Sequence, residues 1–266
     1  MIYVTGDTHG RFVRIYELIK RVRPTIADIL IILGDAGINY FDNKKDLSLK
    51  AQLAELPLTF LCIHGNHEMR PENISSYQEI PWRSGTAYVE KEFPNLVFAK
   101  DGEVYQLEGM RVMPIGGAYS TDKDYLISGR GVDGWCGWWA DEEPSDEIKK
   151  RVETRLEEEA WKLDVVLSHT CPKKYLKDLV GATRPASSTR LKLEVRNNPT
   201  EDWLETIETR LDYKKWYCGH WHVNFGVDKL LCLFEVILPF VTEPEAGLPG
   251  EWGNESLIQG FEERLR

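Results

Sequence analysis

Cysteine is scarce in this chain and irregularly placed. The 266 residues include five cysteines, which are odd in number, widely spaced and never arranged as Cys-x-x-Cys. This pattern argues against a disulfide framework and against a zinc site built from thiolates. We therefore expect reduced, mostly buried thiols at Cys62, Cys136, Cys171, Cys218 and Cys232.

Long apolar runs and excess positive charge are also missing. No segment approaches the roughly 20 apolar residues that a membrane-spanning helix needs, so we expect no membrane association. The first apolar run already reaches a polar turn at Gly6-Asp7, where a signal peptide would overlap the fold, and this predicts a cytoplasmic protein. The formal net charge of −10 does not suit a dedicated duplex binder, which leaves nucleic acid only as a substrate.

Five short apolar runs predict buried strands, because each run ends in a Gly, Asp or Ser turn. The runs are Ile2–Val4, Ile29–Leu33, Phe60–Ile63, Val165–Leu167 and Trp216–Cys218. Polar residues follow each run, and α/β sheets build their sites just beyond the carboxyl ends of strands. The five turns read Gly6-Asp7-Thr8-His9, Gly34-Asp35, Gly65-Asn66-His67-Glu68, Ser168-His169 and Gly219-His220-Trp221-His222.

Helices are predicted between several of these strands. Apolar residues recur at helical spacing over residues 12–22, and Pro24 follows where the helix must have ended. Ser145 is placed as the N-cap of a second helix that reaches about Trp161, and Pro199 as the first residue of a third. Residues 84–118 alternate between apolar and polar side chains, which predicts a β-rich middle.

The chain length fits a single domain over residues 1–266. The stretch 119–144 combines glycines with three tryptophans, Trp135, Trp138 and Trp139, and resembles neither a helix nor a strand. Loops of this length are usually functional, so we expect a lid or insertion there. The segment after about residue 240 is rich in Glu, Gly and Pro and is expected to form a peripheral tail.

Histidine is rare, and its placement is the strongest chemical signal. Five of the six histidines stand in the turns after the predicted strands, beside Asp or Asn. In extended backbone, residues two apart project to the same side. Asp7 with His9, and His220 with His222, are therefore each expected to present two ligand atoms toward one point. Imidazole combined with carboxylate suits Mn²⁺, Fe, Co²⁺ or Zn²⁺.

The order Asp-x-His, Gly-Asp, Gly-Asn-His-Glu, His, Gly-His-x-His resembles the metal-binding pattern of calcineurin-like metallophosphoesterases. The resemblance implies an α/β fold of two mixed β-sheets packed as a sandwich and flanked by helices, with the site above the strand ends. It also implies two divalent ions, with Mn²⁺ expected and Fe, Zn²⁺, Co²⁺ or Ni²⁺ as alternatives. The implied ligands are Asp7, His9, Asp35, Asn66, His169, His220 and His222.

Carried over residue by residue, the resemblance divides these ligands between the two ions. The first ion would be held by Asp7, His9 and His222, and the second by Asn66, His169 and His220. Asp35 would bridge both. The implied reaction is hydrolysis of a phosphate ester, in which a hydroxide activated by the two ions attacks in line. His67 would be the catalytic acid that protonates the leaving oxygen, and not a ligand.

The chain departs from the protein Ser/Thr phosphatases of this superfamily. Those enzymes carry Gly-Asp-x-x-Asp-Arg-Gly, where this chain has Gly34-Asp35-Ala36-Gly37-Ile38-Asn39, and an Arg where this chain has His64. The usual phosphate-binding arginines are therefore missing, which disfavours protein phosphatase activity. The run Gly117-Ala118-Tyr119-Ser120 instead resembles bacterial and phage members. Substrate contacts are expected among Arg11, Arg70, Tyr119, Lys123 and Arg130.

Two other functions remain open beside a phosphoesterase acting on a small phosphomonoester or a nucleotide-like phosphodiester. A nuclease or a cyclic-nucleotide-type phosphodiesterase is the enzymatic alternative, because the tryptophans of residues 119–144 could stack on bases. The acidic composition disfavours a nuclease. A catalytically silent metal-bound scaffold is the non-enzymatic alternative, which the complete ligand set and His67 oppose. The sequence indicates no particular oligomeric state.

Overall fold

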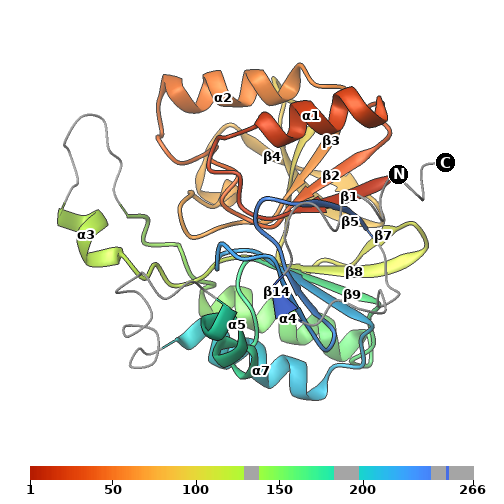
Figure 1. Ribbon diagram of the computed structural model, residues 1–266, viewed down its shortest axis with the longest axis vertical. Helices are drawn as coiled ribbons and strands as arrows, with labels where there is room; N and C mark the ends of the chain where they lie inside the picture. The colour runs from red at the N-terminus through yellow and green to blue at the C-terminus, as the bar shows by residue number, and fades with distance from the viewer. Residues whose placement is uncertain (129–137, 183–197, 241–249, 252–266) are drawn as a thin grey trace.

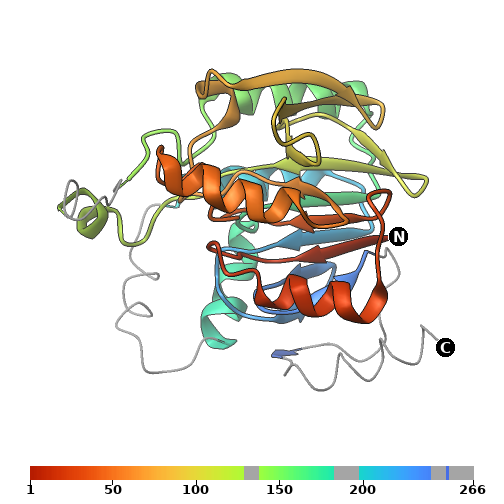
Figure 2. The ribbon, with the colours of Figure 1, turned by 90° about the horizontal axis from the view of Figure 1, so that it is seen from above.

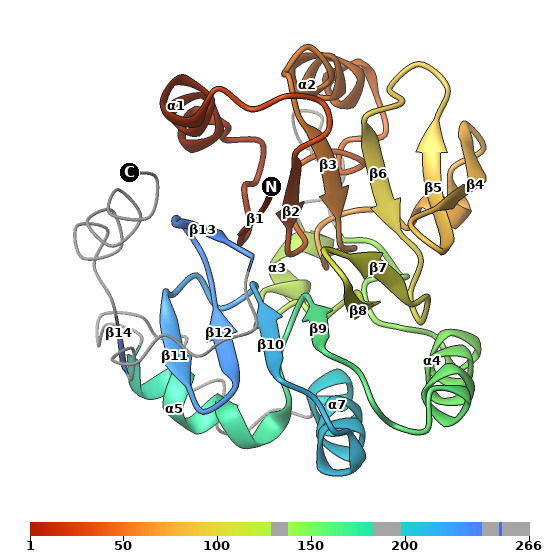
Figure 3. The ribbon, with the colours of Figure 1, turned by 90° about the vertical axis from the view of Figure 1, so that its right-hand side faces the viewer.

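The computed structural model describes residues 1–128, 138–182, 198–240 and 250–251. Within these residues, two seven-stranded β-sheets pack face to face between two layers of helices (Figure 1). The fold is therefore α/β with two mixed sheets flanked by helices, which confirms the architecture implied by the resemblance. Figure 3 separates the two sheets most clearly, with one above the other and helices on both outer sides.

The first sheet is formed mainly by the N-terminal half of the chain. Its strands are β1 (Ile2–Thr5), β2 (Ile29–Ile32), β3 (Thr59–Cys62), β4 (Tyr77–Trp82), β5 (Gly85–Glu90), β6 (Leu96–Ala99) and β13 (Ile237–Pro239). They lie in the order β13-β1-β2-β3-β6-β5-β4 and are parallel from β1 to β6. Helices α1 (Val13–Val22) and α2 (Lys44–Ala54) cover the outer face, as Figures 1 and 2 show.

The second sheet is formed by the later part of the chain. Its strands are β7 (Tyr105–Leu107), β8 (Met110–Ile115), β9 (Val165–Ser168), β10 (Lys215–Cys218), β11 (Phe225–Val227), β12 (Leu230–Cys232) and β14 (Gly250–Glu251). Their order is β14-β11-β12-β10-β9-β8-β7, with parallel pairing from β12 to β8. Helices α4 (Asp146–Glu158), α5 (Leu176–Ala182) and α7 (Pro199–Arg210) cover its outer face. The remaining elements are α3 (Lys123–Ser128) and two 3₁₀ turns, η1 (Pro71–Asn73) and η2 (Lys173–Tyr175).

Three apolar layers hold the sandwich together. One lies between the sheets and includes Val4, Ile31 and Leu167, which are fully buried. The other two lie between each sheet and its helices, where Ile15 of α1 and Val152 of α4 are fully buried. Because the central strands are covered on both faces, their sequences read as continuous apolar runs. Burial of each such side chain contributes about 1.5–3 kcal/mol to the stability of the folded state.

The five predicted strands and the three predicted helices are all present. Helix α1 ends at Val22, and the following Arg23 adopts a left-handed conformation with φ of 48°. Ser145 caps α4 as predicted, because its hydroxyl accepts a hydrogen bond from the Ile148 N–H. Helix α4 ends at Glu158, before the expected Trp161, because Ala160 and Trp161 have φ of 52° and 54° and cannot continue a right-handed helix.

The prediction that residues 119–144 form no helix was wrong for Lys123–Ser128, which form α3. This helix is too short to show an apolar period in the sequence. It projects from the side of the molecule opposite the N-terminus (Figures 1 and 2). Trp135 and Arg130, and most of the tail predicted after residue 240, lie outside the described residues. None of the helices within the described ranges is long and apolar enough to cross a membrane.

The cysteines are buried thiols wherever the structure describes them. Cys62, Cys171, Cys218 and Cys232 are free and buried, as expected. Cys136 lies outside the described residues. The four described thiols therefore pack as small apolar side chains in the core.

Candidate metal centre

The predicted ligands gather where strands of both sheets end. The loops after β1, β2 and β3 leave the first sheet, and the loops after β9 and β10 leave the second. Neighbouring strands within each group run parallel, so their carboxyl ends lie at one edge of each sheet. The site therefore lies across the seam between the two sheets, which is a consequence of the topology.

The backbone brings the side chains together in a way that the sequence did not predict. His9, Asp35, His220 and His222 adopt left-handed conformations with φ of 47°, 47°, 66° and 52°. Such values are uncommon for residues other than glycine and are concentrated at functional sites. The expectation of extended backbone was therefore wrong, and His220 and His222 face two different groups of ligand atoms instead of one point.

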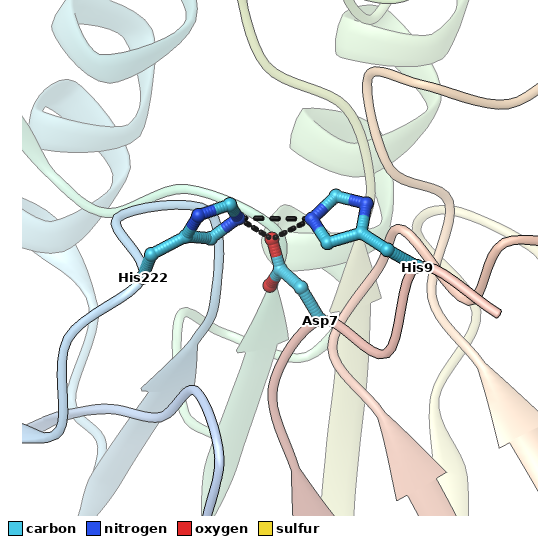
Figure 4. Close-up of side chains that lie close together, drawn as sticks. All are labelled: Asp7, His9 and His222. Carbon is cyan, nitrogen blue, oxygen red and sulfur yellow. Dashed lines mark hydrogen bonds and ion pairs between the residues drawn. The ribbon is translucent and has the colours of Figure 1, made fainter. Parts of the chain in front are cut away.

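The first group consists of Asp7, His9 and His222 (Figure 4). His9 Nε2 lies 2.9 Å from His222 Nε2, and Asp7 Oδ2 lies 3.2 Å from His222 Nε2 and 3.7 Å from His9 Nε2. Ligand atoms that share one ion at about 2.0–2.2 Å are spaced in this way. Asp7 Oδ2 is buried without a hydrogen-bond partner, and a cation would satisfy it.

The second group surrounds the amide oxygen of Asn66. This atom, Oδ1, lies 2.8 Å from His169 Nε2 and 2.9 Å from His220 Nδ1. His169 Nδ1 lies 2.7 Å from the Leu33 carbonyl oxygen, to which it can only donate, and this directs Nε2 toward Asn66. Asp35 Oδ2 lies 3.6 Å from His169 Nε2. The second group therefore offers oxygen and nitrogen ligands that fit a divalent metal ion.

Two buried carboxylates connect the groups and create the charge that an ion would balance. Asp7, Asp35 and His169 also form a compact group of potential ligands. Burial raises the pKa of Asp35, but His169 and His67 outweigh it and hold that pKa well below its usual range. Burial disfavours the charged form of His169, yet Asp35 and Asp7 raise its pKa to about 10. Burial and the charge of His169 lower the pKa of His220 to about 3. The two carboxylates therefore favour a positive charge on His169.

Two glycines allow the loops to approach the carboxylates closely. A Cβ atom at position 65 would lie 2.1 Å from Asp35 Oδ1, and one at position 219 would lie 2.3 Å from Asp7 Oδ1. Real Cβ atoms do not approach oxygen atoms so closely, so Gly65 and Gly219 cannot be replaced without moving the ligands. The glycines of the predicted turns thus serve the packing of the site.

Two side chains that the sequence did not assign to the site support these loops: Arg14, which is half-buried, and Glu68. Arg14 Nη2 donates to the carbonyl oxygens of Gly6 and Asp7, both at 2.7 Å. Glu68 is fully buried and accepts a hydrogen bond of 2.8 Å from the Gly65 N–H. Glu68 belongs to the Gly-Asn-His-Glu motif, so its presence could have suggested a role. Arg14 lies in the first turn of α1 and carried no such signal.

His67 lies beside the ligand groups without joining them. Its ring centroid is 5.9 Å from that of His9 and 6.3 Å from that of Tyr40, and the side chain is half-buried. Its backbone N–H donates to Asp35 Oδ1 at 2.9 Å, which fixes the loop that carries it. The geometry is compatible with a residue that faces a substrate and does not hold an ion.

The residues predicted to contact substrate differ in their exposure and in their contacts. Arg11 is exposed and lines a hollow of about 700 Å³ together with His9 and His222. Tyr119 is half-buried, and Lys123 Nζ lies 3.6 Å from Glu142 Oε1 and 4.0 Å from the ring centroid of Trp138. Arg130 lies outside the described residues.

Arg70, which was expected to contact substrate, is buried and paired with a carboxylate in the structure. The residue is 3% exposed, and its Nη1 donates to Asp101 Oδ2 at 2.6 Å. Its backbone N–H and Nε donate to Asp141, both at 3.0 Å. A guanidinium that is buried and paired in this way has a structural role, because separating it from its partner would leave a buried charge.

A buried carboxyl group lies behind the second sheet's ligands. Thr170 follows His169, and its hydroxyl donates to Glu201 Oε1 at 2.7 Å. Trp221, between His220 and His222, donates to the same hydroxyl at 3.2 Å. Glu201 Oε2 is buried without a partner, and burial raises the pKa of Glu201 to about 7. A protonated carboxyl group fits this position better than a charged one.

We predict that Glu201→Gln stabilises the protein relative to wild type more at pH 8 than at pH 5. The pKa is raised on folding, so the wild type loses stability as pH rises from the unfolded value near 4.5 through about 7. The variant stays neutral and escapes this loss, which is on the order of 3 kcal/mol for a shift of this size. Thermal unfolding of both proteins at the two pH values measures the difference. An unchanged difference would mean that Glu201 titrates normally.

Comparison with known protein families gives one match. The model of the family described as calcineurin-like phosphoesterase matches residues 1–224. This range includes every proposed ligand, from Asp7 to His222, and all the described strands except β11, β12, β13 and β14. A comparison with curated proteins gives no match.

Proposed function

The chain belongs to the calcineurin-like phosphoesterase family, whose members are hydrolases of phosphate esters, and we propose that it is a dinuclear metal-dependent phosphoesterase. The observation that carries the proposal is the convergence of two adjacent ligand groups around buried Asp7 and Asp35. Two buried carboxylates in contact with several imidazoles are costly unless cations compensate them. The buried carboxylates and imidazoles therefore support candidate sites for divalent ions.

The proposed ligand sets follow the two groups. One ion would be held by Asp7, His9 and His222, and the other by Asn66, His169 and His220, with Asp35 shared. Mn²⁺ is the proposed ion, because oxygen and imidazole ligands without thiolate suit it. Divalent ions held in this way lower the pKa of bound water and neutralise charge on a phosphoryl group.

The protein's own residues would orient the reaction and supply a proton. His67 is the proposed general acid, because its ring lies beside the first ligand group while its backbone N–H is bound to Asp35. Asp35 thereby connects the position of the ions to the position of the acid. Fixing both groups before the substrate arrives lowers the entropic cost of reaching the reactive geometry.

The proposed substrate is a small phosphate ester. The arginines typical of the protein phosphatases are absent from their motifs, and Arg70 is buried in an ion pair. The hollow beside His9 and His222 offers room for the non-reacting part of a small substrate, with Arg11 at its side. A nuclease is less well supported, because Trp139 donates its indole N–H to the Tyr40 carbonyl and Trp138 contacts Lys123. Both described tryptophans of the 119–144 segment are thus engaged in packing.

A substrate panel tests the function directly. Purified protein with Mn²⁺ is expected to hydrolyse p-nitrophenyl phosphate or bis-p-nitrophenyl phosphate and to contain about two ions per chain. Nucleotides and single-stranded DNA in the same panel separate the alternatives. The absence of hydrolysis with a full complement of ions would support the silent scaffold, and one ion or none would contradict a dinuclear centre.

We predict that Arg11→Ala raises the KM for a p-nitrophenyl ester about 3- to 10-fold, with a smaller effect on kcat, because a single guanidinium contact to phosphate is lost. Lys20→Ala is the matched control, since Lys20 is also an exposed cation of the α1 region but does not line the hollow. Steady-state kinetics at constant ionic strength measure both variants. Equal effects of the two substitutions would assign the change to overall charge.

A further inference from the structure

The amide of Asn66 must point one way if Asn66 is a metal ligand. An amide side chain ends in an oxygen, which can bind a cation, and an NH₂ group, which cannot. In the structure the oxygen faces His169 and His220, at 2.8 and 2.9 Å. Rotating the amide by half a turn would replace the ligand atom by the NH₂ group. The second ligand group therefore needs a contact that holds this orientation before an ion binds.

That contact is provided by Ser120, at the start of the 119–144 segment. Asn66 Nδ2 donates to Ser120 Oγ at 2.9 Å. A hydroxyl can donate or accept, so Ser120 alone would not distinguish the two ends of the amide. The orientation of the amide is fixed only if a third group accepts a hydrogen bond from the hydroxyl, so that the hydroxyl oxygen acts as an acceptor toward Asn66.

Glu142 is such a third group. Its Oε2 accepts the Ser120 backbone N–H at 3.2 Å, and the Ser120 hydroxyl interacts with the same carboxyl group. When Glu142 is ionised it can only accept, so a Ser120 hydroxyl that donates to it keeps its lone pairs for the Asn66 NH₂ group. Asn66, Ser120 and Glu142 are 2%, 0% and 1% exposed, so water has little access to substitute for any of these bonds.

The backbone holds Glu142 in this position. The Ala118 N–H donates to the Glu142 carbonyl oxygen at 3.1 Å, which ties the two ends of the segment together. The preceding residue, Asp141, accepts the two hydrogen bonds from Arg70. The buried Arg70 therefore anchors Asp141, the residue next to Glu142. Arg70 thus supports the position of Glu142 indirectly.

We propose that Ser120 and Glu142 are positioning residues that orient the Asn66 oxygen toward the second ion and thereby set the affinity for that ion. The inference rests on the proposed function, because it requires Asn66 to be a metal ligand. Residues that hold metal ligands in place typically change metal affinity 10- to 100-fold when they are replaced. The effect should be confined to the second ion, because Asp7, His9 and His222 make no described contact with Ser120.

Calorimetric titration of the metal-free protein with Mn²⁺ tests the proposal without reference to activity. Ser120→Ala is expected to raise the dissociation constant of one ion by about 10- to 100-fold and to leave the other unchanged. Electron paramagnetic resonance at one equivalent and two equivalents of Mn²⁺ should then report an isolated ion where the wild type shows a coupled pair. Ser120→Thr retains the hydroxyl and should restore the second ion.

Ser76→Ala is the matched control, because it removes a hydroxyl that donates to the carboxylate of Glu90 at 2.6 Å, outside the ligand groups. It should leave both dissociation constants unchanged. Wild-type affinity for both ions in Ser120→Ala would overturn the inference. If that variant does not fold, Glu142→Gln provides the test. Its amide can donate a hydrogen bond to Ser120, so that the hydroxyl no longer favours the NH₂ end of Asn66. An unchanged dissociation constant for the second ion in Glu142→Gln would likewise overturn the inference. Fewer than two ions in the wild type would instead remove the proposed function.

Discussion

Asp35→Asn is expected to impair both metal sites together and to lower kcat/KM on the order of 10³-fold or more. Asp35 is buried between the two ligand groups, with Oδ2 3.6 Å from His169 Nε2 and Oδ1 bound to the His67 N–H. An amide at this position removes a negative charge that both ions are proposed to share, and it presents only one ligand oxygen. Elemental analysis after extensive dialysis, together with kinetics in saturating Mn²⁺, measures the two losses.

Two further variants show whether the loss reflects sharing. His9→Ala should chiefly weaken the first ion, because the His9 ring contacts Asp7 and His222 of the first ligand group. Glu90→Gln alters a buried carboxylate that pairs with Lys50 at 2.6 Å, and it should retain both ions even though it costs stability. If Asp35→Asn lost one ion and kept the other at full affinity, Asp35 would not be a bridging ligand.

His67→Ala is expected to retain both ions and to lose about 10²- to 10⁴-fold in turnover of esters with poor leaving groups. Alkoxide leaving groups need a proton as the bond to phosphorus breaks, whereas p-nitrophenolate leaves without one. The loss should therefore be several-fold smaller for p-nitrophenyl esters than for alkyl esters. Comparing kcat across a series of leaving groups measures the dependence.

Two outcomes would contradict this role. A defect of equal size for p-nitrophenyl and alkyl esters would show that His67 does not transfer a proton to the leaving oxygen. Loss of an ion would make His67 a ligand, although its ring lies outside both compact ligand groups among the described residues. His67→Gln serves as a variant that keeps hydrogen bonding without a titrating ring.

The residues that meet at the site could be predicted because the information was local. Asp7 and His222 are far apart in the chain, but each follows a short apolar run that ends in a polar turn. Parallel pairing within each sheet then brings these turns to one edge, whichever helices connect them. A periodic pattern and an ordered motif therefore sufficed for the strands and for the set of side chains that meet at their ends.

Features that depend on distant partners could not be predicted in this way. Arg70 looks like an exposed cation in the sequence, and only the fold reveals Asp101, 31 residues away, as its buried partner. The left-handed conformations of His9 and His222 are likewise imposed by packing, since local preference opposes them. The sequence also did not predict the contact between Ser120 and Asn66, because these residues lie 54 positions apart.

The division of the ligands between the two sheets has a consequence for how the molecule comes apart. Asp7, Asp35 and Asn66 follow strands of one sheet, whereas His169, His220 and His222 follow strands of the other. Ions bound there would cross-link the two sheets, in addition to the apolar layer that packs between them. Separating the sheets would then require releasing the ions first, because the unfolded chain cannot present all these ligands at once. Removal of the ions by a chelator would thus lower the free energy of unfolding, and the metal centre would contribute to the stability of the fold.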